Sequence, residues 1–244
     1  MANPVLNSKT FAAPGTATGV ETMTIEGTVN KTGILLFLVV ATACWMWTQT
    51  YNAVDPDAAM PWMWGGVLGG LAVGIATRFK PQWAPVTAPL YAALEGLALG
   101  GISAWYAAAY PGILIQAVSL TFITLFVMLL AYRSGLVRAT PAFRKVIGIA
   151  MSAILLYYLV VLGMSLFGVG TAWFYGGGTL GIGISLLITG VAAFRMILDF
   201  DLIEQGVQQG APKAMEWYGA FALVVGLIWL YLEILRLLGR LRRR

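Results

Sequence analysis

The chain has 244 residues, of which 59% are hydrophobic and only 10% are charged, with a formal net charge of +5. Soluble domains usually carry about 25% charged residues, so this composition excludes a soluble globular protein and indicates a polytopic membrane protein. The absence of histidine and the single cysteine exclude a histidine proton relay, a Ser–His dyad, a histidine- or thiolate-bound metal and an intrachain disulfide.

Residues 1–31 are polar and are expected to form an amino-terminal arm, without the apolar core of a cleavable signal peptide. Seven apolar segments follow, each close to the ~20 residues that cross the hydrocarbon layer: 33–50, 61–78, 84–106, 112–132, 145–168, 178–200 and 216–238. The chain is therefore predicted to be an all-α integral membrane protein with an arm at 1–31, one seven-helix membrane domain at 32–239 and a basic tail at 240–244. Such a tail is expected to contact anionic lipid headgroups rather than nucleic acid.

The loop charges predict an orientation, because cytoplasmic loops carry an excess of Lys and Arg. The loops after segments one, three and five contain neither residue, and the first of them holds Asp55 and Asp57. This alternation places the amino terminus in the cytoplasm. The seventh segment leaves two alternatives, since it either crosses fully and carries the basic tail outside or is re-entrant. The basic residues after segments two and four are Arg78, Lys80, Arg133, Arg138, Arg144 and Lys145.

Small residues repeat at helical spacing in two neighbouring segments. Such stripes let helix backbones approach closely in a membrane and predict a tight bundle. Cys44 lies within an apolar run and is expected to be a packing residue. The stripes are Gly66, Gly70 and Gly74 in the second segment, and Ala92, Gly96 and Gly100 in the third.

Acidic residues interrupt the last two apolar segments. Asp199 and Asp201 close the run that ends at Phe200, and Glu233 lies inside the run 220–238. A charged side chain at the centre of a bilayer costs about 2.5–3.5 kcal/mol on insertion scales. Two carboxyl groups in contact cannot both ionise cheaply, and together they bind a proton or a hard cation such as calcium. These acids are therefore the first candidates for a functional site.

Helical geometry sorts the candidates. Arg195 and Asp199 are four residues apart on one face and are expected to neutralise each other, which leaves Asp201 as the available acid. Glu233 has Arg236 three residues later, and an ion pair within the helix is the alternative to a functional role.

Glu95 stands in the third segment with no basic residue within four positions. Two interpretations of this acid remain open. It is either hydrogen-bonded to a neighbouring helix in a structural role, or it lines the same cavity as Asp201 and Glu233.

The chain resembles the Bax inhibitor-1 family, also called the transmembrane Bax-inhibitor-motif family, in its bacterial branch. The family typically has an aromatic–Asp dipeptide at the end of span six, a Leu-aromatic-Leu-Asp run in span seven and an arginine near the end of span two, followed eighteen residues later by a glycine. Glu233 stands where the family usually has Asp. The matching residues are Phe200-Asp201-Leu202-Ile203, Leu230-Tyr231-Leu232-Glu233-Ile234-Leu235, Arg78 and Gly96, with Asn3-Pro4-Val5, Met23-Thr24-Ile25-Glu26 and Lys31-Thr32-Gly33-Ile34-Leu35 near the amino terminus.

The resemblance implies a seven-helix fold with the last helix at the centre of the other six. It also implies a calcium leak channel controlled by pH, in a bacterial inner membrane, with calcium as permeant ion, protons as regulator and no cofactor. Asp201 and Glu233 would be the proton sensor and transient calcium ligands, and Arg78 the latch on one of them. Asp199 is an alternative to Asp201 in register.

Other functions remain as alternatives. The chain is alternatively a membrane interaction protein that modulates a membrane protease or a stress-response partner through the arm 1–31. A proton-coupled transporter ranks third, on the glycine-rich start of the sixth segment at Gly176. No nucleophile–base pair, metal cage or phosphate loop indicates an enzyme.

Overall fold

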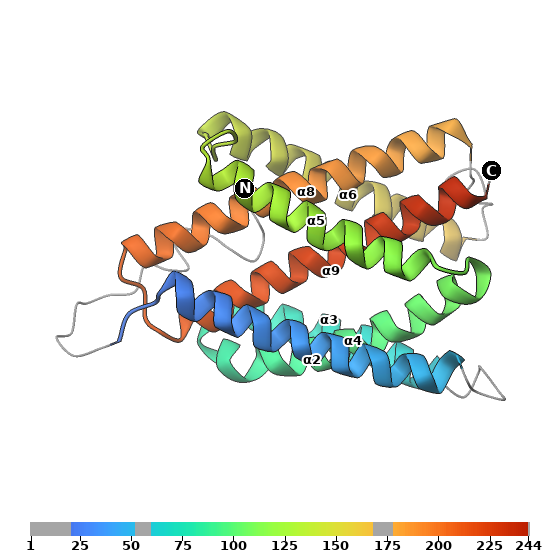
Figure 1. Cartoon of the computed structure of the whole chain (residues 1–244), viewed down its shortest axis with the longest axis horizontal. Coiled ribbons are helices and arrows are strands. Elements are labelled where there is room, and N and C mark those ends of the chain that lie inside the picture. The colour runs from blue at the N-terminus through green and yellow to red at the C-terminus, as the bar shows by residue number, and fades with distance from the viewer. Residues whose placement is uncertain (1–20, 52–59, 168–177, 244) are drawn as a thin grey trace. The chain divides into compact units, whose positions relative to one another are not determined.

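The computed structural model describes residues 21–51, 60–167 and 178–243, and these are helical apart from turns and one isolated β-bridge. Seven helices in this part of the chain are long and apolar enough to cross a membrane, which confirms the predicted fold class (Figure 1). A single turn of 3₁₀ helix, η2 (Pro81–Trp83), joins the second and third. The seven are α2 (Ile25–Tyr51), α3 (Met60–Phe79), α4 (Ala84–Ala109), α5 (Ile113–Arg133), α6 (Pro141–Leu166), α8 (Thr179–Gln208) and α9 (Met215–Arg242).

Most helices extend beyond the apolar segments that predict them. At 1.5 Å per residue, the 30 residues of α8 span about 45 Å, which exceeds the ~30 Å hydrocarbon core. Asp201 therefore lies on α8 rather than in the loop expected after residue 200, and α2 takes up the last residues of the expected arm 1–31. Likewise α6 begins at Pro141 rather than 145, because Thr140 accepts the backbone N–H of Phe143 (3.2 Å) as its N-cap and proline fits the first turn.

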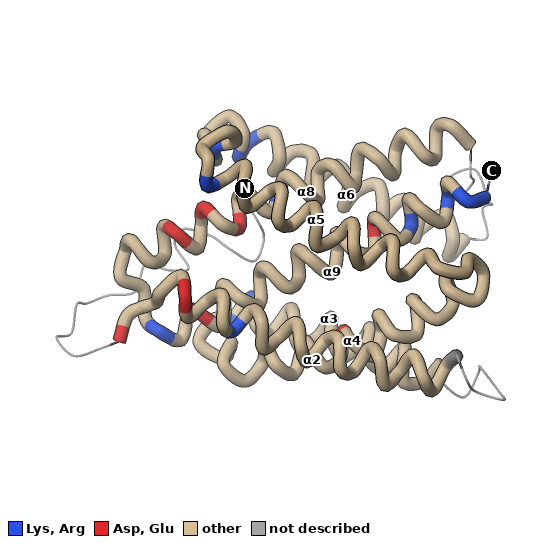
Figure 2. The backbone as a smooth tube through the Cα atoms, viewed as in Figure 1, with Lys and Arg blue, Asp and Glu red and all other residues tan. Residues whose placement is uncertain are grey.

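The last helix is continuous. α9 runs for 28 residues without a break, so it is long enough to cross the membrane, which favours full crossing over the re-entrant alternative. It is also the most buried of the seven, with 61% of its most apolar window buried, against 17% in α2, α3, α5 and α6. Figure 2 shows the long uncharged stretches that all seven helices share.

The chain forms two compact units, and α8 and α9 each contribute to both. Unit 1 contains Gly112–Phe200 and Gly226–Arg244, and unit 2 contains Pro4–Pro111 and Asp201–Val225. Asp199 and Glu233 therefore belong to unit 1, and Asp201 belongs to unit 2.

In unit 2, α4 packs against both α2 and α3 through the predicted small residues. A Cβ atom at Gly96 would overlap the side chain of Thr42, and one at Gly100 would overlap the backbone of Ala43, both in α2. On the other side, a Cβ atom at Gly66 of α3 would lie only 2.6 Å from a backbone oxygen of α4. The close approach that the stripes predict is therefore present at both helix pairs.

In unit 1, arginines at the end of α9 tie the helix to its neighbours. Arg240, only 6% exposed, donates to the backbone oxygen of Gly181 (2.5 Å) and to Ser185 Oγ (2.7 Å), both at the start of α8. Arg242 donates to Gln116 Oε1 of α5 (3.0 Å). The expectation of a headgroup-contacting tail from residue 240 is thus wrong for Arg240, because this guanidinium is used inside the protein.

The position of Cys44 differs from the expectation. Cys44 is exposed on α2 rather than buried in the packing between helices. This side chain therefore faces away from the core, on the helix surface available to lipid. Residues 1–20, 52–59, 168–177 and 244, which include Asp55, Asp57 and Gly176, lie outside the described residues.

Candidate functional site

Glu233 is the most enclosed acid on α9 in unit 1, with 1% of its surface exposed. One of its oxygens, Oε1, accepts hydrogen bonds from three groups: Tyr158 Oη (2.6 Å), Trp229 Nε1 (3.0 Å) and Arg236 Nη1 (2.8 Å). Arg236 also donates to the hydroxyl of Tyr158. Tyr158 belongs to α6 and the other three residues to α9, so this cluster joins two helices. The ion pair of Glu233 with Arg236, one of the two alternatives from the sequence, is present.

The two oxygens of Glu233 are used very differently. Oε1 is surrounded by donors, whereas Oε2 is buried and has no hydrogen-bond partner among the described residues. A buried carboxylate oxygen without a donor is costly. Oε2 is therefore the less satisfied of the two carboxyl oxygens.

A second buried ion pair lies on α8 in the same unit. Arg195 and Asp199 are 3% and 0% exposed, and Arg195 Nη2 lies 3.6 Å from Asp199 Oδ2. This confirms the predicted i, i+4 pair. α9 passes directly over it at a glycine, since a Cβ atom on Gly226 would lie 3.2 Å from Asp199 Oδ2. Close approach of the two backbones at Gly226 is what buries the pair.

Trp229 connects the two ion pairs of unit 1. The guanidinium carbon of Arg195 lies 6.0 Å from the centroid of the Trp229 ring, within the range of a cation–π contact. The indole N–H of the same residue donates to Glu233. The acids Asp199 and Glu233 are therefore linked through one aromatic side chain, and we call this set of six residues the α8–α9 relay: Arg195, Asp199, Trp229, Glu233, Arg236 and Tyr158.

The other predicted site residues lie in unit 2. Asp201 is half-buried and accepts a hydrogen bond from Gln205 Nε2 one turn later (2.9 Å). Arg78 is exposed in the last turn of α3, and its charge acts on the hydroxyl of Tyr218. Since Asp201 and Glu233 belong to different units, their pairing stays a prediction, and so does the role of Arg78 as a latch.

Glu95 is held by its own helix. Its carboxyl group accepts a hydrogen bond from Tyr91, four residues earlier on α4. Its carboxyl group packs against α3 at Gly70, where a Cβ atom would lie 3.1 Å from Oε1. In this position Glu95 fills the contact between α3 and α4.

Two residues of the relay were missed from the sequence. Trp229 precedes Glu233 by one helical turn, and an aromatic N–H donor at i−4 of a buried acid is a signal that could have been recognised. Tyr158 is 75 residues from Glu233 in the chain, and only its polar hydroxyl in the middle of an apolar segment marks it.

Metal ligands are sparse in this part of the protein. Across 21–51, 60–167 and 178–243, no group of three or more acidic or cysteine side chains is arranged to hold a metal ion. Calcium usually takes six to eight oxygen ligands.

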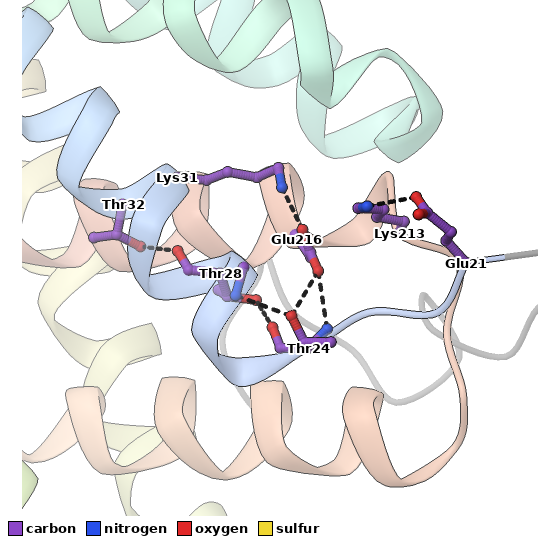
Figure 3. A network of polar contacts seen from close by, with 8 residues as sticks. Glu21, Thr24, Thr28, Lys31, Thr32, Lys213 and Glu216 are labelled. Atoms are coloured by element: carbon purple, nitrogen blue, oxygen red, sulfur yellow. Dashed lines mark hydrogen bonds and ion pairs between the residues drawn. The ribbon is translucent and has the colours of Figure 1, made fainter.

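A separate polar network lies in unit 2, where the chain enters α2 (Figure 3). Glu216, 1% exposed at the start of α9, accepts from the backbone N–H of Thr24 (3.0 Å) and its hydroxyl (2.9 Å), and is ion-paired with Lys31. Beside it, the backbone N–H of Met23 donates to Ala211 O (2.7 Å). Residues 21–31 are thus fastened to the turn between α8 and α9, and we call this contact the clasp.

Comparison with models of protein families identifies a family that this chain matches. The model of the family described as Bax inhibitor 1 like matches residues 3–243, which is nearly the whole chain. Comparison with curated proteins and with solved structures gives no match.

Proposed function

Because the chain belongs to the Bax inhibitor 1-like family of membrane proteins, we propose that it is a pH-sensitive cation leak channel with calcium as its permeant ion. The observation that carries this proposal is the carboxyl group of Glu233. It is buried in a membrane-crossing helix and has one oxygen without a hydrogen-bond donor among the described residues. Such a group binds either a proton or a cation, and the two compete.

Arg236 takes a specific role in this proposal. A guanidinium within hydrogen-bond distance of Glu233 neutralises it and repels a calcium ion. A cation therefore reaches Glu233 only when Arg236 turns away, and the 32% exposure of its side chain leaves room for that movement. Protonation of Glu233 removes its negative charge and so breaks the same ion pair. Proton binding and calcium binding thus both replace the ion pair of Glu233 with Arg236. This competition makes the calcium leak depend on pH.

The remaining residues of the prediction keep their proposed roles. Asp201 is the second carboxyl of the sensor, with Arg78 as its latch, and Asp199 is linked to Glu233 through Trp229. We also propose a bacterial inner membrane with the amino terminus in the cytoplasm. In that orientation α9 carries the carboxyl terminus to the outside, where Arg240 and Arg242 bond to α8 and α5.

The test is calcium flux into proteoliposomes at several pH values. We expect a pH-dependent flux in the wild type, and a flux that no longer varies with pH in Glu233→Gln, because glutamine keeps the shape but cannot titrate. Glu26→Gln is the matched control, since Glu26 is an exposed carboxylate in the first turn of α2. Asp201→Asn tests the second carboxyl in the same assay.

Two results would count against the channel. If Glu233→Gln kept the full pH dependence of the wild type, Glu233 would have no part in sensing. If no variant and no wild-type protein gave flux above empty liposomes, the alternative of a modulator of a membrane protease or stress-response partner would replace the channel. Its test is a deletion that ends at residue 20, because residues 21–31 hold the clasp and the start of α2.

A further inference from the structure

A cavity of about 600 Å³ opens beside the clasp in unit 2. Its walls come from residues 21–24, the first turns of α2 and the start of α9, and include Asn30, Ile34 and Trp217. Lysine and tryptophan side chains at the ends of membrane-crossing helices lie at the level of the lipid headgroups. The cavity therefore opens where phospholipid phosphates are found.

The buried carboxylate in this cavity is already occupied. Both oxygens of Glu216 are used, Oε1 by two bonds from Thr24 and Oε2 by the ammonium group of Lys31 (Figure 3). Glu21 is ion-paired with Lys213 at the rim. A cation that binds Glu216 would have to displace Lys31 or the hydrogen bonds from Thr24.

Several N–H donors in this cavity, in contrast, are not used. Each lysine ammonium has three N–H donors, and among the described residues Lys31 and Lys213 each contact a single carboxylate. The amide group of Asn30 makes no hydrogen bond within the described part of the chain, and this residue is exposed to the cavity. Glu21 raises the pKa of Lys213, so this ammonium stays charged. The cavity thus suits a ligand that is rich in acceptor oxygens and carries a negative charge.

An apolar path leaves the cavity along α2. Ile34 is part of the lining and is 50% exposed, and Phe37 and Val40 follow at helical spacing with 71% and 53% exposure. These residues face lipid in a membrane-crossing helix. A ligand with an anionic head and an apolar chain would therefore satisfy both parts of the surface, whereas a free phosphate ion would use only the first.

From the unused donors and the adjoining apolar path, we propose that this cavity binds the phosphate headgroup of an anionic phospholipid. Lys31 supports the phosphate from the inner wall, where Glu216 and the ring of Trp217, 5.6 Å from its ammonium, hold it in place. Lys213 contributes from the rim, because its ion pair with Glu21 is exposed at 51% and 74% and exchanges readily with solvent or ligand. Bound lipid would then bridge α2 and α9 and stabilise the clasp. This site is independent of the ion pathway.

The experiment uses the full-length protein purified in a maltoside detergent. Phosphatidylglycerol, phosphatidylcholine and glycerol phosphate are titrated separately, with the thermal unfolding midpoint and native mass spectrometry as readouts. Ligand that binds the folded state raises the midpoint in proportion to the logarithm of its concentration. We expect saturable binding of phosphatidylglycerol and no saturable binding of phosphatidylcholine or glycerol phosphate. In the double variant Asn30→Ala, Lys213→Gln, the apparent Kd for phosphatidylglycerol should rise at least about tenfold.

The variant is chosen to leave the fold intact. Both of its positions are exposed, and neither side chain is hydrogen-bonded to Glu216. Lys80→Gln is the matched control. Like Lys31, Lys80 lies over a tryptophan ring (4.2 Å from the centroid of Trp83), but it is outside the cavity lining. Equal phosphatidylglycerol affinity in the double variant and the wild type would overturn the proposal. Equal binding of phosphatidylcholine or of glycerol phosphate would also overturn it, because headgroup charge or the lipid chain would then not be recognised.

Discussion

Removing the hydroxyl of Tyr158 is the sharpest test of the relay. In Tyr158→Phe, Glu233 loses its only hydrogen bond from α6 in the described part of the chain, and Arg236 loses an acceptor. Hydrogen bonds between neutral groups across membrane helices contribute about 0.6 kcal/mol on average. A hydrogen bond to a charged group contributes about 1.5–3 kcal/mol. The contact between Tyr158 and Glu233 is short (2.6 Å) and part-buried, and its acceptor is a carboxylate, so we expect a loss of about 2 kcal/mol in the free energy of unfolding.

The assay is a double-mutant cycle of Tyr158→Phe and Glu233→Leu, which has no acceptor for the hydroxyl, with unfolding in mixed detergent and SDS micelles followed by near-ultraviolet circular dichroism. The cycle isolates the pairwise term, provided that each single variant only removes the contact. We expect a coupling energy of about 1–2 kcal/mol. A coupling below about 0.3 kcal/mol, the usual error of additivity, would refute the claim that this hydroxyl holds the carboxyl group.

Two further predictions concern unit 2. Gly96→Ala brings a Cβ atom into contact with side-chain and backbone atoms of α2, and it should lower the free energy of unfolding by about 1–3 kcal/mol. Gly163→Ala in α6 is the control. Nothing lies within 4 Å of a Cβ atom at that position, so this variant should not destabilise the protein. Lys31→Met leaves Glu216 buried without its counter-ion and should cost about 3 kcal/mol, at the lower end for a broken buried pair, because Thr24 still donates two hydrogen bonds. Partial rescue by adding Glu216→Gln to Lys31→Met is expected in the same unfolding assay, and no rescue would contradict the pairing.

The features that could be predicted from the sequence were those with a local signal. The seven spans follow from hydrophobic length, and the Arg195–Asp199 pair follows from i, i+4 spacing, which the structure confirms. The small-residue stripes likewise identified the close contact of α4 with α2, because glycine spacing encodes a face of a helix.

Contacts between distant segments carried no such signal. The bond between Tyr158 and Glu233 joins residues from α6 and α9, and the clasp joins Thr24 to Glu216, 192 positions away. Cys44 was assigned to the packing because an apolar run in a membrane helix has no polar face to mark the lipid side. Helix ends were placed too early or too late because polar turns continue a helix beyond the hydrocarbon layer.

The composition of the two units has a consequence for biosynthesis. The ribosome completes α2, α3 and α4 first, yet unit 2 also needs 201–225, which are made only after 112–200 have emerged. Unit 1 in turn is complete only when the end of α9 has been synthesised. Neither unit is finished until the last helix enters the bilayer, so a chain truncated before α9 leaves both incomplete. Quality-control proteases of the membrane would therefore meet an unfinished protein for almost the whole of its translation.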